Sequence, residues 1–134
     1  MITGRLLDDD GAMLIRYEGD AKGVLTASQI AVGEENALKI RIYGTKGGLE
    51  WCQEEPNTMW MKWPDRPREM IRTSNGYMSE MAAHNSRTPG GHPEGYIEAF
   101  ANIYRNFALT LQAMKEGKEP SSLCLDFPSV QEGV

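Results

Sequence analysis

The sequence predicts an α+β fold: a mostly antiparallel, open sheet of about six strands with one long helix packed on one face. Two patterns carry this prediction. Between residues 12 and 73, short segments alternate apolar with polar residues and are separated by glycine-rich or polar turns, as in strands joined by hairpins. Between residues 93 and 116, apolar residues recur every three or four positions instead, which is typical of a helix.

Six segments are expected to form the strands: 12–17, 23–32, 38–43, 49–52, 58–63 and 68–73. The polar stretch 18–23 indicates a hairpin loop between the first two. The run 44–48 is expected to reverse the chain with glycines at positive φ. Trp60 and Trp63 fall on opposite faces of a regular strand, so the second face of the sheet needs cover from another domain or another copy.

The long helix is expected to begin at Pro93, whose missing N–H has no partner in a first turn, and to run for roughly 22 residues. Gly117 in a left-handed conformation and Pro120 are expected to end it. Five residues at helical spacing predict a buried apolar face: Phe100, Ile103, Phe107, Leu111 and Met114. The solvent face is expected to carry Glu98, Asn102, Arg105, Gln112 and Glu116.

The remaining segments have weaker patterns. Residues 78–84 are compatible with one or two helical turns, and residues 121–128 are expected to be extended. Residues 129–132 resemble the start of another helix, which the last residue, Val134, cuts off. That ending favours a fragment of a larger protein.

Size and charge bound the function. A chain of 134 residues is expected to form a single domain spanning 1–134. A net charge of −5 without a basic cluster argues against nucleic acid as a partner. No apolar run is long enough to cross a membrane and the N-terminus lacks the pattern of a secretion signal, so a cytoplasmic protein is expected. Cys52 and Cys124 are isolated, which predicts free thiols and no metal site.

The candidate site residues lie in the loop before the long helix and at its start. His92 precedes the predicted helix N-terminus, where its ring and free backbone N–H groups can meet a hydroxyl or carboxylate. Arg87 can pair with an acidic group and Tyr96 can offer a stacking face. The alternatives are that His92 caps the helix or fills the loop, and that Arg87 and Tyr96 are surface or packing residues. No residue is assigned a catalytic role.

Two runs, GHPEGYIEAFANIY at 91–104 and IRIYGTKGGLEW at 40–51, resemble the C-terminal domain of Gfo/Idh/MocA-type oxidoreductases. The resemblance implies a parent enzyme whose N-terminal Rossmann domain binds NAD or NADP and supplies a lysine. It also implies that this domain closes over a sugar or polyol, with the loop around His92 lining the pocket, and forms homo-oligomers through the sheet. The family's Gly-x-Gly-x-x-Gly and Glu-Lys-Pro motifs do not occur, so no cofactor-binding or catalytic residue is expected in this chain.

Two functional hypotheses follow. The first is the C-terminal substrate-binding and oligomerisation domain of an NAD(P)-dependent sugar or polyol dehydrogenase, inactive alone and holding no cofactor itself. The alternative is a stand-alone, non-catalytic dimerisation or interaction module whose sheet pairs with itself or with a separate protein.

Overall fold

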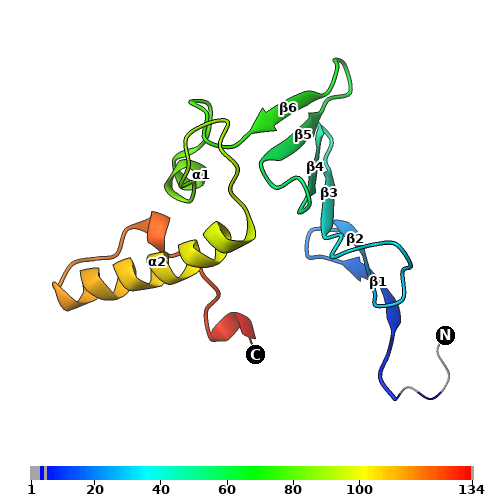
Figure 1. Cartoon of the computed structure of the whole chain (residues 1–134), viewed down its shortest axis with the longest axis horizontal. Coiled ribbons are helices and arrows are strands. Elements are labelled where there is room, and N and C mark those ends of the chain that lie inside the picture. The colour runs from blue at the N-terminus through cyan, green and yellow to red at the C-terminus, as the bar shows by residue number, and fades with distance from the viewer. Residues whose placement is uncertain (1–3, 5, 134) are drawn as a thin grey trace. The chain divides into compact units, whose positions relative to one another are not determined.

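The computed structural model describes residue 4 and residues 6–133. Within this described part, the chain contains six strands, two α-helices and two short 3-10 helices (Figure 1). The chain divides into two compact units, residues 1–36 and residues 37–134. The α+β class with six antiparallel strands and one long helix is thereby confirmed, although the strands form two sheets rather than one.

The first unit is a β-hairpin. Strand β1 (Asp10–Arg16) pairs antiparallel with β2 (Lys22–Ser28), in the register that places Asp10 opposite Ser28. The Tyr17 N–H donates to the carbonyl of Ala21 at 2.8 Å, and Gly19 adopts a φ of +81°, which closes the loop tightly. The predicted first hairpin is confirmed, with β2 ending earlier than expected.

The second unit contains a four-stranded antiparallel meander. Its strands are β3 (Lys39–Tyr43), β4 (Gly48–Cys52), β5 (Thr58–Lys62) and β6 (Glu69–Arg72). Each strand pairs with its neighbour in the chain, in the order β3-β4-β5-β6. The four predicted strands of this region are confirmed to within a residue or two, because their alternation was strong and their turns were short.

The glycines of the β3–β4 turn differ from the prediction. None of Gly44, Gly47 and Gly48 has a positive φ. A Cβ atom on Gly47 would instead lie 2.7 Å from the carbonyl oxygen of Lys62, and one on Gly48 would lie 3.0 Å from that of Ile42. Glycine is therefore required here because neighbouring backbone approaches closely, not because the turn needs a left-handed residue.

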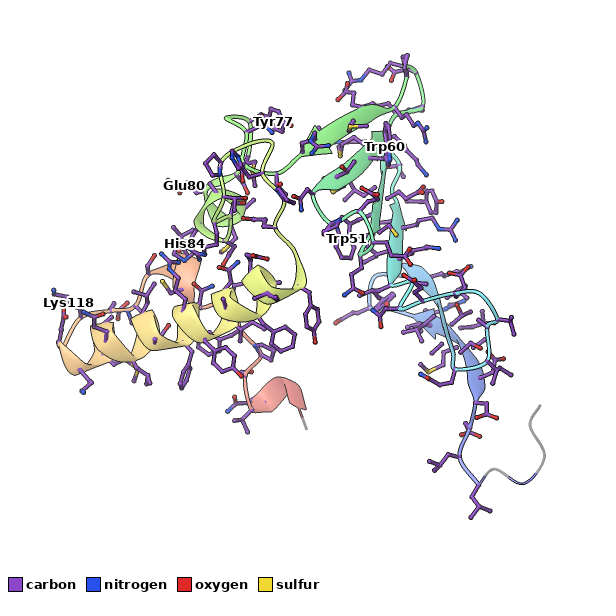
Figure 2. The ribbon with its side chains drawn as sticks, in the orientation of Figure 1. Trp51, Trp60, Tyr77, Glu80, His84 and Lys118 are labelled. Carbon is purple, nitrogen blue, oxygen red and sulfur yellow. The ribbon has the colours of Figure 1, made fainter. Side chains whose placement is uncertain are left out.

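The register gives the meander two different faces. Cross-strand partners on one face are almost entirely apolar: Ile40, Trp51, Met59 and Ile71 in one row, and Ile42, Leu49 and Met61 in the next. The opposite face mixes charged and aromatic residues: Arg41, Glu50, Trp60 and Met70 in one row, with Tyr43 and Lys62 in the next. Trp51 and Trp60 can be located in Figure 2.

Charged groups on the mixed face pair with one another and with rings. The Lys62 ammonium forms an ion pair with Glu50, and its hydrogen bond and charge hold the pKa of the Glu50 carboxyl below its usual value. The Arg68 guanidinium lies 4.1 Å from the ring centre of Trp60. We call this surface of β3–β6 the mixed face.

The helices are α1 (Glu80–His84), α2 (Tyr96–Lys115), η1 (Ser122–Cys124) and η2 (Gln131–Gly133). Helix α2 begins at Tyr96, so the prediction that it begins at Pro93 is wrong. The Gly95 N–H donates to the Glu98 carboxylate at 2.8 Å and caps the helix there. Gly117, with a φ of +69°, follows the C-terminus as predicted.

One other expectation for the C-terminal part is wrong. Residues 121–128 are not extended throughout but contain η1, because the Ser121 hydroxyl accepts the Leu123 N–H and initiates a turn. Near the C-terminus, where the sequence resembles a helix start, the described residues form the single 3-10 turn η2. None of the helices in the described part of the chain is both long and apolar enough to span a membrane.

The predicted packing of α2 is also wrong. Its apolar residues, Phe100, Ile103, Phe107, Leu111 and Met114, remain between 44% and 62% exposed. Asn106 on another side is only 2% exposed and Thr110 is buried. Within the described part of the second unit, α2 packs against η1 and against none of the strands (Figure 1). The burial of Asn106 and Thr110 shows that a polar side of α2 lies inward. Amide and hydroxyl groups tolerate this burial because they are hydrogen-bonded.

Candidate functional site

The segment between α1 and α2 is organised by the carboxylate of Glu94. One oxygen of this carboxylate, Oε2, accepts hydrogen bonds from the backbone N–H groups of Arg87 and Thr88, both at 2.8 Å. The Thr88 hydroxyl lies 3.1 Å from the same oxygen. These bonds join the two ends of a short segment, which we call the 87–94 loop. A carboxylate that receives several N–H donors makes stronger hydrogen bonds than a neutral acceptor does.

The backbone of Glu94 is held separately by Asn57, in the turn between β4 and β5. The Glu94 N–H donates to the Asn57 side-chain oxygen at 3.0 Å, and the Asn57 amide group donates to the Glu94 carbonyl. One side-chain amide therefore satisfies both polar groups of one peptide residue. This pair ties the 87–94 loop to the sheet of the second unit.

His92 lies exposed in the 87–94 loop. Its backbone N–H donates to the Pro89 carbonyl at 3.1 Å, and its ring Nδ1 lies 3.3 Å from the same oxygen. The Thr88 hydroxyl lies 3.1 Å from the His92 carbonyl. Within the described residues the ring Nε2 makes no hydrogen bond, so it faces solvent and is available to a ligand.

The guanidinium of Arg87 is partly committed to the helices. Its Nε donates to the Asn102 side-chain oxygen at 2.6 Å, and its Nη2 donates to the His84 carbonyl at 3.3 Å. Arg87 is exposed. It therefore fastens the start of the 87–94 loop to α1 and α2, while part of its donor fork faces solvent.

Tyr96 is placed differently from the other two candidates. It is the first residue of α2, is 66% exposed, and packs its ring 4.8 Å from that of Phe100. The structure thus brings Arg87 and His92 into one hydrogen-bonded loop. No contact in the described part of the chain joins Tyr96 to either of them; it begins the exposed apolar stripe of α2 instead.

An open pocket of about 400 Å³ adjoins the start of this loop. Polar side chains line much of it: Ser74, Asn75, Ser86, Arg87 and Thr88. Its volume falls at the small end of the roughly 300–1,000 Å³ typical of small-molecule sites. Each of these side chains carries a hydrogen-bonding group.

A second polar cluster, not predicted from the sequence, joins α1 to α2. The ring Nε2 of His84 lies 2.9 Å from Asn106 Oδ1 and 2.9 Å from Arg105 Nη1 (Figure 2 labels His84). Asn106 also donates to the Asn85 side-chain oxygen at 2.9 Å. With Asn106 nearly inaccessible, this cluster holds the two helices together. In the described residues, no three acidic, histidine or cysteine side chains gather as metal ligands would.

The described residues do not fit a nicotinamide dinucleotide. Binding of its pyrophosphate at a helix N-terminus requires free N–H groups after a parallel strand. Every strand pair described here is antiparallel. At the start of α2 the Gly95 N–H is already bonded to Glu98, and this bond holds the pKa of the Glu98 carboxyl below its usual value. A carboxylate in this position repels phosphate.

The second unit combines an antiparallel meander sheet with a polar loop that leads into one long helix. Residues 2–50 match the GFO/IDH/MocA C-terminal domain. The chain belongs to this family of C-terminal domains.

Known proteins similar to this chain are oxidoreductases. The structure of an oxidoreductase from Sinorhizobium meliloti is 40% identical with a TM-score of 0.89, over 98% of this chain and 37% of that one. An inositol dehydrogenase homolog from Azotobacter vinelandii, solved with NAD+, is 32% identical with a TM-score of 0.85, over 96% of this chain and 33% of that one. It was also solved with NADH and myo-inositol.

A curated relative gives the same relation. The uncharacterized oxidoreductase YfiI of Bacillus subtilis is 30% identical over 128 residues, which are 96% of this chain and 33% of that protein. The chain therefore spans about a third of the length of the relatives that it matches.

Proposed function

We propose that residues 1–134 act as the substrate-binding and oligomerisation domain of an NAD(P)-dependent sugar or polyol dehydrogenase. The observation that carries this proposal is the exposed His92 imidazole on a loop fixed at both ends by the Glu94 carboxylate. The myo-inositol and NADH bound to the similar A. vinelandii protein support a polyol as the class of substrate.

Each candidate residue has a role suited to a polyol. The free Nε2 of His92 exchanges a hydrogen bond with a substrate hydroxyl, as donor or acceptor according to its tautomer. The solvent-facing part of the Arg87 guanidinium donates to a second hydroxyl. The Tyr96 ring offers an apolar surface to the C–H face of the substrate.

The cofactor belongs to a different part of the parent enzyme, since the residues described here do not fit it. Hydride transfer requires the donor and acceptor carbons to be held about 3–3.5 Å apart. A chain that binds only the polyol cannot meet this requirement. We therefore expect no NADH formation when this chain alone is mixed with NAD+ and myo-inositol.

The proposal extends to self-association through the mixed face. Trp60, with Arg68 stacked over it, is half-buried on this surface, and Glu50 and Lys62 pair beside it. Aromatic and arginine side chains are common at the centres of protein interfaces. Light scattering of the chain over a concentration series should show a dimer or larger species. Trp60→Ser should shift the equilibrium toward the monomer. A wild-type chain that is monomeric at all concentrations would contradict the proposed homo-oligomer.

Titration of the 15N-labelled chain with myo-inositol tests the binding role. Saturable shifts of the backbone amides of residues 86–96, reduced in His92→Ala, would support the proposal. A wild-type chain without saturable shifts would contradict it. Dimer formation without polyol binding would favour the alternative function, a non-catalytic association module.

A further inference from the structure

We infer that Glu94 is the positioning residue of the 87–94 loop: its carboxylate sets the conformation in which His92 meets the substrate. The reference to a substrate rests on the function proposed above. The effect on the loop itself rests only on the contacts of Glu94.

The Glu94 carboxylate holds the backbone at the start of the loop. The N–H groups of Arg87 and Thr88 both end on Glu94 Oε2 at 2.8 Å. Thr88 is half-buried, so its N–H would lose a protein partner without gaining full hydration if the carboxylate were removed. Because residues 87 and 94 are the two ends of the loop, this one side chain closes it.

Glu94 is itself held by Asn57. Asn57 pairs with both the N–H and the carbonyl of Glu94, so the backbone that carries the carboxylate is fixed to the sheet. The carboxylate therefore transmits a fixed position to the start of the loop. A side chain on an unrestrained backbone could not do this.

His92 is held through the start of the same loop. Within the described residues, it hydrogen-bonds to Thr88 and Pro89. The Thr88 hydroxyl lies 3.1 Å from both the His92 carbonyl and Glu94 Oε2, and its single hydrogen serves one of them at a time. Gly91, with a φ of +86°, lies between these residues and His92 in a conformation that favours glycine. The position of His92 thus depends on the residues that Glu94 holds.

Amide hydrogen exchange of the 134-residue chain tests this inference. In Glu94→Ala, exchange at Arg87 and Thr88 should accelerate at least tenfold. Exchange at Ala99, whose N–H donates to the Gly95 carbonyl in α2, should stay unchanged and report that the fold persists. Glu94→Gln keeps an acceptor oxygen and should restore most of the protection, and Glu119→Ala, at an exposed acid outside the loop, should behave as wild type.

The His92 ring provides a second readout. Its proton resonances should differ from wild type in Glu94→Ala and return toward wild type in Glu94→Gln, which a general loss of stability would not produce. If Glu94→Ala does not fold, Thr88→Val is used in its place. This variant should alter the His92 resonances while the amides of α2 stay protected from hydrogen exchange. Unchanged exchange at Arg87 and Thr88 in folded Glu94→Ala would overturn the inference, as would unchanged His92 resonances in every folded variant.

Titration with myo-inositol separates this inference from the proposed function. If the wild type binds and Glu94→Ala weakens binding about tenfold or more, which is about 1.4 kcal/mol, both stand. If the loop loses protection in Glu94→Ala but the wild type does not bind, the proposed polyol function fails and the positioning role of Glu94 stands. If the wild type binds and Glu94→Ala binds equally well, the positioning role is overturned.

Discussion

The side-chain amide of Asn57 hydrogen-bonds to both backbone polar groups of Glu94, a residue 37 positions later in the chain. This pair connects the turn between two strands to the loop that precedes the long helix. The position of the loop relative to the sheet therefore depends on this pair.

Asn57→Ala should destabilise the chain by about 1–3 kcal/mol, because it leaves the half-buried N–H and carbonyl of Glu94 without partners. Urea denaturation measures the change. Asn75→Ala is the matched control, since within the described part of the chain the Asn75 amide group donates to the carbonyls of Arg72 and Thr73 in its own turn and to no other residue. Equal stabilities for the two variants would contradict the anchoring role of Asn57.

Gly47→Ala should cost about 1–3 kcal/mol, because its Cβ would lie 2.7 Å from a backbone oxygen that cannot move without distorting β5. Gly44→Ala in the same turn should change stability by less than about 0.5 kcal/mol. Its Cβ meets only an ordinary 3.5 Å contact, and its φ is not positive. Thermal unfolding of both variants checks this, and a larger loss at Gly44 would refute the close-approach explanation.

Asn106→Ala should destabilise the chain by about 2–3 kcal/mol, because Asn106 is nearly inaccessible and bonds both His84 and Asn85. Its loss should release α1 from α2. Hydrogen exchange at the Ala83 and Asn85 amides, which close the turns of α1, should accelerate before exchange in the middle of α2 does. Retained protection at both amides would show that α1 is held by other contacts.

The cap at the start of α2 should make stability depend on pH in a predictable direction. Because the Gly95 N–H lowers the pKa of Glu98 in the folded state, ionised Glu98 stabilises the fold above the ordinary glutamate pKa of about 4.3. The stabilisation is lost as the pH falls through the lowered value. The difference in unfolding free energy between wild type and Glu98→Ala should therefore be present at neutral pH and shrink in acid; a difference independent of pH would mean that the carboxylate charge plays no part.

Local patterns predicted the strands and helices well. The alternation at residues 38–43 and the spacing after residue 95 located β3 and α2, since each depends on neighbours within one element. The start of α2 was misplaced by three residues. Pro93 fits a first helical turn, but the capping bond from Gly95 to Glu98 and the tertiary bonds of Glu94 to Asn57 decide the boundary.

The packing and most of the site could not be predicted in this way. Helical spacing identified the apolar stripe of α2, but not whether anything in this chain covers it, because burial depends on contacts between distant segments. Neither Glu94 nor His84 is among the candidate site residues that the sequence predicts. Their partners, Asn57 and Asn106, are 37 and 22 residues away, and no local spacing links such pairs.

The most direct test of the central claim uses a chimera. The matched third of the A. vinelandii inositol dehydrogenase homolog would be replaced by this chain. NADH formation from NAD+ and a panel of polyols would then be measured beside NAD+ binding. We predict that the chimera oxidises at least one polyol. In His92→Ala, kcat/KM for that polyol should fall about tenfold or more, which corresponds to about 1.4 kcal/mol of transition-state stabilisation. In Glu119→Ala, kcat/KM should be unchanged. A chimera that folds and binds NAD+ but oxidises no polyol, or whose kcat/KM is unaffected by His92→Ala, would contradict the assignment of this domain as the substrate side of the enzyme.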